Sequence, residues 1–182
     1  MVMSWNTRIK QMKRLEKLCC KDGAKGIDIG CGMHKICDTA IGVDFTTAHG
    51  RTPDVMSMAD DLPMFKDNEL DYVVNCHLLE HLADTKKALK EWYRVLKSGG
   101  YLGISIPHGE LDHSAIYTIE HLSGFTPKTL ELFMHWSGFD VTHNEVIREP
   151  EKGSRWNIIC VGNKNPDRKP RYVVDTERYK HK

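Results

Sequence analysis

The fold is decided by the stretch Gly26-Ile27-Asp28-Ile29-Gly30-Cys31-Gly32, in which a short apolar strand runs directly into two glycines. Glycines that follow a strand let the backbone turn tightly and approach a ligand where a side chain would clash. A second strand, 40–43, begins eight residues past Gly32 and ends at Asp44. The gap has room for one helical turn at most, so the first crossover helix is predicted to be shortened.

Apolar residues predict the remaining elements. Residues at three- and four-residue steps predict helices over 4–20, 84–96 and 126–138, and short apolar runs bounded by turn residues predict strands. Seven strands are predicted, at 26–29, 40–43, 55–58, 70–75, 100–106, 139–147 and 156–161. Strands that alternate with helices predict an α/β fold: a doubly wound, Rossmann-like, seven-stranded and mostly parallel sheet that ends in an antiparallel hairpin.

The length of 182 residues suits one domain, with 40% hydrophobic and 28% charged residues. These values exclude collagen-like, low-complexity and wholly disordered chains. We expect a single domain over 1–162, opened by an amphipathic helix within 1–22, and a basic tail over 163–182. The chain has no apolar run of membrane-span length, no secretory leader pattern, and six cysteines without a C-x-x-C pair. We therefore expect reduced thiols, no membrane association and a cytoplasmic location.

The net charge of +1 is unevenly distributed, at +5 over 1–25, −8 over 26–162 and +4 over 163–182. Basic ends could bind a phosphate-rich partner such as a nucleic acid, although basic tails are more often simply solvated. An anionic partner, if the chain has one, is expected at these ends. The sequence does not indicate an oligomeric state.

The glycine loop and Asp44 together indicate a cofactor that contains adenosine. A carboxylate at the end of the second strand can accept both hydroxyl hydrogens of a ribose bound over the first loop. A dinucleotide would need a third glycine and a full helix whose N-terminus faces the pyrophosphate, but Lys35 stands at the third position. An NAD-dependent dehydrogenase or nucleotide-sugar enzyme is disfavoured for the same reason.

The chain resembles the class I S-adenosylmethionine-dependent methyltransferases, specifically the methyltransferase type 11 family. Five motifs match in order between residues 25 and 110. They are the glycine loop at 26–32, the acidic motif at 41–44, the segments at 59–65 and 68–71, the motif at 77–81 and the helix-to-strand passage at 88–101.

The resemblance implies S-adenosylmethionine as cofactor and assigns its contacts by position. Asp28 is expected near the methionine ammonium, and Asp44, followed by Phe45, near the ribose. The usual third loop glycine is replaced by His34, and a common acidic residue is replaced by Met58. The full set of implied cofactor residues is Asp28, Gly30, Cys31, Gly32, Asp44, Phe45, Met58, Ala59, Asp60, Asn75, Cys76 and His77.

Polar side chains after the fifth strand are the candidates for the acceptor side. Transfer to a protonated oxygen or nitrogen needs a base, and His108 follows the end of that strand. Glu110, His113 and Tyr117 are expected to bind substrate, the alternative being that these loop residues face only solvent. We expect methyl transfer to an O or N atom of a small-molecule or glycan-type acceptor. A non-catalytic cofactor-binding module and a nucleic-acid methyltransferase acting through the basic ends are the alternatives.

The run His77-Leu78-Leu79-Glu80-His81 matches the H-x-x-E-H pattern of some zinc peptidases. In the family that the chain resembles, this segment is a turn next to the cofactor that leads into a helix. Nothing else in the sequence supplies a peptidase context. No metal site is therefore expected.

Overall fold

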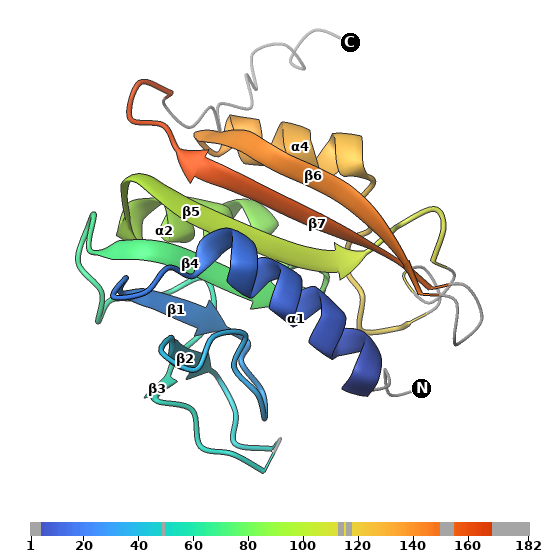
Figure 1. Ribbon diagram of the computed structural model, residues 1–182, viewed down its shortest axis with the longest axis horizontal. Helices are drawn as coiled ribbons and strands as arrows, with labels where there is room; N and C mark the ends of the chain where they lie inside the picture. The colour runs from blue at the N-terminus through green and yellow to red at the C-terminus, as the bar shows by residue number, and fades with distance from the viewer. Residues whose placement is uncertain (1–4, 49, 113–114, 116–117, 150–154, 169–182) are drawn as a thin grey trace, which may run out of the picture.

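Seven strands form one sheet in the order β3-β2-β1-β4-β5-β7-β6 (Figure 1). The computed structural model describes residues 5–48, 50–112, 115, 118–149 and 155–168. The strands are β1 (Gly26–Ile29), β2 (Ile41–Asp44), β3 (Val55–Met56), β4 (Leu70–Cys76), β5 (Leu96–Pro107), β6 (Phe139–Glu149) and β7 (Arg155–Lys164).

Strand directions confirm the predicted mostly parallel sheet. β1 pairs in parallel with β2 and β4, β4 with β5, and β2 with β3. β7 runs antiparallel to both β5 and β6, so the C-terminal hairpin is confirmed as well. β5 starts four residues earlier than the run 100–106, because Leu96 already pairs with Leu70 across an irregularity in the β4–β5 ladder.

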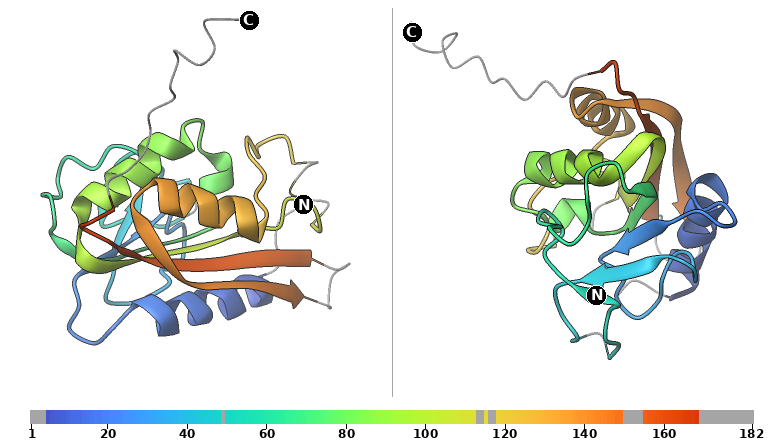
Figure 2. Two further views of the ribbon diagram at one scale, coloured as in Figure 1. Left: turned by 90° about the horizontal axis from the view of Figure 1, so that it is seen from above. Right: turned by 90° about the vertical axis from the view of Figure 1, so that its left-hand side faces the viewer.

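Helices cover both faces of the sheet, as the two views of Figure 2 show. α1 (Trp5–Cys19) lies on one face, where Met12 and Leu15 pack against Val74. α2 (Thr85–Val95) and α4 (Pro127–Trp136) lie on the other. The side chain of Asp84 caps α2 by accepting the N–H of Lys87, and α2 buries the predicted apolar stripe at Ala88, Leu89, Trp92 and Val95. Thr126 caps α4.

The connection from β1 to β2 contains turns and no helix over residues 30–40. The buried carboxylate of Asp28 accepts the backbone N–H of Ile36 at 2.6 Å and so holds this connection against the sheet. Ile36, Cys37 and Ala40 are buried in the same cluster as the apolar side of α1. The connection therefore covers sheet surface without the crossover helix that the short spacing already disfavoured.

The described parts of both basic ends are partly neutralised by the body of the protein. Arg14 of α1 pairs with Glu145 of β6 at 2.7 Å, and Arg168 pairs with Asp140 at 2.7 Å. The buried Lys164 donates from Nζ to Asn68 Oδ1 at 2.7 Å and to two backbone carbonyls. β7 thus continues two residues past 162, and the rest of the predicted tail, 169–182, lies outside the described residues.

None of the described helices has the length and hydropathy that a membrane span requires.

Candidate functional site

The carboxyl ends of β1, β2, β4 and β5 lie along one edge of the sheet, at the right of Figure 1. The N-terminal end of α1 and the segment between β5 and α4 lie at the same edge (Figure 1). In open α/β sheets, ligands bind beyond this edge where the strand order reverses. Here the order reverses between β1 and β4, so the candidate site is centred there.

The glycine loop turns sharply directly after β1. Gly30 and Gly32 both adopt left-handed backbone conformations, with φ of +70° and +53°. A Cβ atom on Gly30 would lie 3.1 Å from Leu78 Cδ1, so a side chain there would also press on Leu78. Asp44 Oδ2 accepts the N–H of Gly32 at 3.0 Å, and Asp44 Oδ1 accepts the N–H of Thr46 at 3.3 Å. The structure thus brings together the loop and the carboxylate that the sequence predicted to cooperate.

Cys31 lies inside this loop and is buried. Burial, and secondarily the nearby carboxylates Asp28 and Asp44, raise the pKa of the Cys31 thiol to about 11. A thiol with this pKa is protonated at neutral pH and is a poor nucleophile. The burial and the raised pKa therefore argue against a nucleophilic role for Cys31.

The end of β4 carries a buried amide without a partner. Asn75 has no exposed surface, and neither its Nδ2 nor its Oδ1 has a hydrogen-bond partner among the described residues. An unpaired buried amide costs free energy, and a bound ligand is one of the groups that can complete its hydrogen bonds. Cys76 beside it is buried, and His77 follows with φ of +57°, a strained conformation for a side chain of this size.

Gln11 of α1 also reaches this strand end, although it is not among the residues that the sequence patterns predicted for the site. Its side chain is fully buried, and its Oε1 accepts Ser105 Oγ at 2.8 Å and Cys76 Sγ at 3.5 Å. His77 Nε2 lies 2.9 Å from the same oxygen. The signal was present, because Gln11 is four residues before Leu15 and so shares the apolar side of the helix.

Two large apolar side chains that follow the neighbouring strands β2 and β3 are exposed to solvent. Phe45 is 64% exposed and Met58 is 57% exposed. Exposed apolar side chains beside a polar site can contribute to a ligand-binding surface. The backbone carbonyl of Ala59 accepts a hydrogen bond from Trp92 Nε1 at 2.8 Å. Asp60 forms an ion pair with Lys87 of α2 at 3.0 Å.

His108 follows the end of β5 and is buried. Its Nδ1 accepts the backbone N–H groups of Glu110 and Leu111, each at 3.2 Å, which places the proton of the neutral ring on Nε2. Glu110 is exposed, whereas His113 and Tyr117 lie outside the described residues.

The H-x-x-E-H run does not form the helical metal pair of a peptidase. His81 ends the short 3-10 helix η1 (Leu79–His81), whereas His77 precedes it and turns toward α1. The two histidines are therefore not one turn apart on a single helix. The segment is a turn, as the resemblance implied.

The model of the family described as methyltransferase domain matches residues 11–104, slightly more than half of the chain. The chain belongs to the methyltransferase type 11 family. Its matched region contains the glycine loop, Asp44 and the end of β4, so the family assignment and the site geometry coincide. No curated protein matches the chain significantly.

Solved structures of methyltransferases share the fold of this type 11 methyltransferase domain. A Haloferax volcanii protein solved with the Trm112 methyltransferase activator is 17% identical, with a TM-score of 0.69 over 88% of this chain and 91% of that one. A Thermotoga maritima S-adenosylmethionine-dependent methyltransferase is 22% identical, with a TM-score of 0.67 over 88% and 93%. An Archaeoglobus fulgidus enzyme is 22% identical, with a TM-score of 0.69 over 86% and 94%.

S-adenosylmethionine is the cofactor of this methyltransferase family, and the site of this chain suits it. The glycine loop offers a backbone free of side chains, and the Asp44 carboxylate has lone pairs left after its two backbone contacts. Asn75 offers an unpaired donor and an unpaired acceptor. Phe45 and Met58 offer apolar surface for a flat ring.

Proposed function

We propose that this protein transfers a methyl group from S-adenosylmethionine to an oxygen or nitrogen atom of a small-molecule or glycan-type acceptor. The observation that carries the proposal is the contact between Asp44 and the glycine loop, next to the unpartnered amide of Asn75. A protein that used this fold only as a scaffold would have no need to keep a buried amide unpaired.

The proposed cofactor contacts are those that the family resemblance implies, and the positions of these side chains are compatible with them. Gly30, Cys31 and Gly32 line the methionine portion, and Asp44 holds the ribose hydroxyls. Asp28 supports the loop from below and contributes negative charge near the methionine ammonium. The remaining contacts come from the adjoining strand ends: Phe45, Met58, Ala59 and Asp60 at the adenine, and Asn75, Cys76 and His77 near the reacting centre.

We propose that the acceptor binds beyond the ends of β4, β5 and β7. Asn157 of β7 pairs in register with Pro107 at the end of β5, and both atoms of its buried amide lack hydrogen-bond partners among the described residues. Asn157 lies two residues before Ile159, so it shares the face that α1 covers with Gln11 and Ser105. Polar groups buried on this face favour a polar acceptor of limited size.

The bound cofactor supplies a sulfonium methyl group that is reactive in an in-line displacement. The protein's part is to align the acceptor lone pair with that methyl group and to keep water away. His108 is the candidate base. The N–H groups of Glu110 and Leu111 stabilise the tautomer in which Nε2 carries the hydrogen. Nε2 can accept a proton only after this hydrogen has moved to Nδ1, which would break these two contacts.

The proposal is tested in two steps. Calorimetry of the purified protein with S-adenosylhomocysteine should show one site per chain. Incubation with methyl-labelled S-adenosylmethionine and a cell lysate split into small-molecule, glycan, RNA and protein fractions should then label the small-molecule or glycan fraction. Absence of binding would refute the cofactor site, and label confined to RNA or protein would refute the acceptor class.

A further inference from the structure

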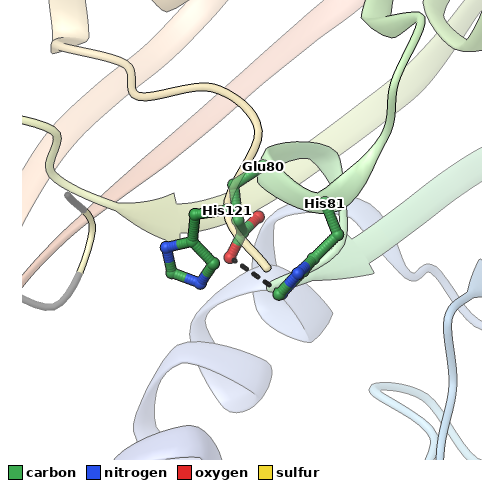
Figure 3. Close-up of side chains that lie close together, drawn as sticks. All are labelled: Glu80, His81 and His121. Carbon is green, nitrogen blue, oxygen red and sulfur yellow. Dashed lines mark ion pairs between the residues drawn. The ribbon is translucent and has the colours of Figure 1, made fainter. Parts of the chain in front are cut away.

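Three side chains next to the proposed acceptor region lie close together and can each offer one metal-ligand atom (Figure 3). Glu80 and His81 belong to η1, directly after β4, and His121 comes from the segment between β5 and α4. The three ligand atoms lie within 4.8 Å of one another. His81 and His121 meet edge to face, with ring centroids 4.7 Å apart.

Both histidine rings are oriented by backbone carbonyls. His81 Nδ1 lies 3.0 Å from Glu120 O, and His121 Nδ1 lies 3.2 Å from Ala115 O. A carbonyl oxygen can only accept, so each Nδ1 carries the hydrogen and each neutral ring keeps its lone pair on Nε2. Metal-binding histidines commonly donate their second N–H to a carbonyl in this way, which fixes the tautomer and the direction of the ring.

Glu80 is the second, independent indication. It is 2% exposed, and neither carboxylate oxygen has a hydrogen-bond partner among the described residues. The nearest groups able to carry positive charge are His77 Nδ1 at 3.2 Å and His81 Nε2 at 4.0 Å from Glu80 Oε1. A carboxylate buried without hydrogen-bond donors is costly unless a cation balances it.

The backbone holds the two parts of the cluster together. The carbonyl of Glu80 accepts the N–H of Leu122 at 2.7 Å and the N–H of Ser123 at 3.2 Å. The backbone hydrogen bonds of the two residues that follow His121 therefore keep it beside η1. A ligand would meet side chains that are already assembled, which reduces the ordering cost of binding.

We propose that Glu80, His81 and His121 bind one divalent transition-metal ion through a Glu80 carboxylate oxygen and the Nε2 atoms of His81 and His121. Two imidazoles and one carboxylate match zinc and related first-row ions, whereas Mg²⁺ and Ca²⁺ prefer oxygen ligands alone. Ligand atoms about 2.1 Å from a tetrahedral zinc ion lie roughly 3.4 Å apart, so a pair as wide as 4.8 Å has to close by more than about 1 Å when the ion binds.

The bound ion would join η1 to the segment between β5 and α4 and leave coordination positions open. His81 is partly exposed, with 34% of its side chain accessible, so water or an acceptor heteroatom can complete the coordination. The site does not depend on the proposed methyl transfer, because its ligands are distinct from the proposed cofactor contacts.

The test uses the untagged full-length protein after treatment with a chelator. Zn²⁺ added in calorimetry and in equilibrium dialysis should bind at one ion per chain. Co²⁺ should give the d–d absorption of a low-coordinate site with nitrogen and oxygen ligands. His121→Ala and Glu80→Gln should each weaken Zn²⁺ binding at least about tenfold.

The matched control is His135→Ala. His135 Nδ1 also lies 3.0 Å from a backbone carbonyl, and its Nε2 lies 3.5 Å from Glu131, but no second histidine among the described residues joins this pair in a possible metal site. This variant should bind Zn²⁺ as the wild type does. Circular dichroism and S-adenosylhomocysteine binding of His121→Ala should match the wild type, which shows that the variant is folded. Failure of the wild type to bind Zn²⁺, or equal binding by His121→Ala, would overturn the proposal.

Discussion

The backbone N–H of Gly32 donates to Asp44 Oδ2 over 3.0 Å, so the carboxylate that ends β2 holds the glycine loop that follows β1. The same carboxylate is the proposed partner of the ribose hydroxyls. Its two tasks are compatible because an ionised carboxylate has about four lone-pair positions. The loop is therefore shaped before a ligand arrives, and less ordering free energy is lost on binding.

Asp44→Ala should weaken binding of S-adenosylhomocysteine about ten- to hundredfold. Hydrogen bonds to a charged group contribute roughly 1.5–3 kcal/mol, and the substitution also releases the loop. Titration calorimetry measures the change. Asp38→Ala is the matched control, because Asp38 is an exposed carboxylate in the same connection and should leave the affinity unaltered. Equal affinities of Asp44→Ala and the wild type would remove Asp44 from the cofactor site.

Asn75→Leu separates a ligand-binding role from a structural one. Its amide has no hydrogen-bond partner among the described residues, so replacing it by an apolar side chain of similar volume should leave the thermal midpoint of the ligand-free protein unchanged or raise it. The rise in the midpoint on adding S-adenosylhomocysteine should become smaller, because that rise follows the affinity. A ligand-free variant that is strongly destabilised would show that Asn75 is structural.

Gln11→Met should destabilise the protein by about 1–3 kcal/mol, because it leaves buried donors without their common acceptor. Ser105 Oγ and Cys76 Sγ both donate to Gln11 Oε1, and methionine has a similar shape but accepts only weakly. Urea unfolding measures the change. Lys10→Met, on the exposed side of the same helix, should change the free energy of unfolding by less than about 0.5 kcal/mol. Equal stabilities of the two variants would contradict the role given to Gln11.

The sequence predicted the sheet well because its signals are local. Apolar runs ending in glycine or aspartate marked β1 and β2, and the eight-residue spacing correctly indicated that a full crossover helix could not fit. The start of β5 was missed because it depends on pairing between Leu96 and Leu70, which is not visible in a local pattern.

The site was harder to predict where it depends on tertiary contacts. The meeting of Asp44 with the loop follows from the order of parallel strands, which the sequence implied. Gln11 belongs to α1, and His121 belongs to the segment between β5 and α4. Both are distant in sequence from the strand end and the short helix that they contact, so no local spacing relates them to β4 or η1. The tautomer of His108 depends on the turn that its own backbone makes, which residue types alone do not specify.

The ion pair between Arg14 and Glu145 should make the attachment of α1 to β6 dependent on pH. The hydrogen bond from Arg14 is the largest cause that lowers the pKa of Glu145 below its usual 4.5, and His143 lowers it further against the effect of burial. A carboxyl group whose pKa is lower in the folded state stabilises the fold above its unfolded pKa, and this contribution is lost as the pH falls through the folded pKa.

Arg14→Gln should therefore lower the urea midpoint at pH 7, and the difference from the wild type should shrink as the pH falls from 7 to below 4.5. Both side chains are about one third exposed, so the effect should be modest and should weaken in 0.5 M salt. Lys17→Gln removes the same charge from an exposed position on α1, and its urea midpoint should stay near that of the wild type at each pH. If the difference for Arg14→Gln were constant across this range, the ion pair would not be the source of the stability, and packing of the arginine stem on the sheet would be.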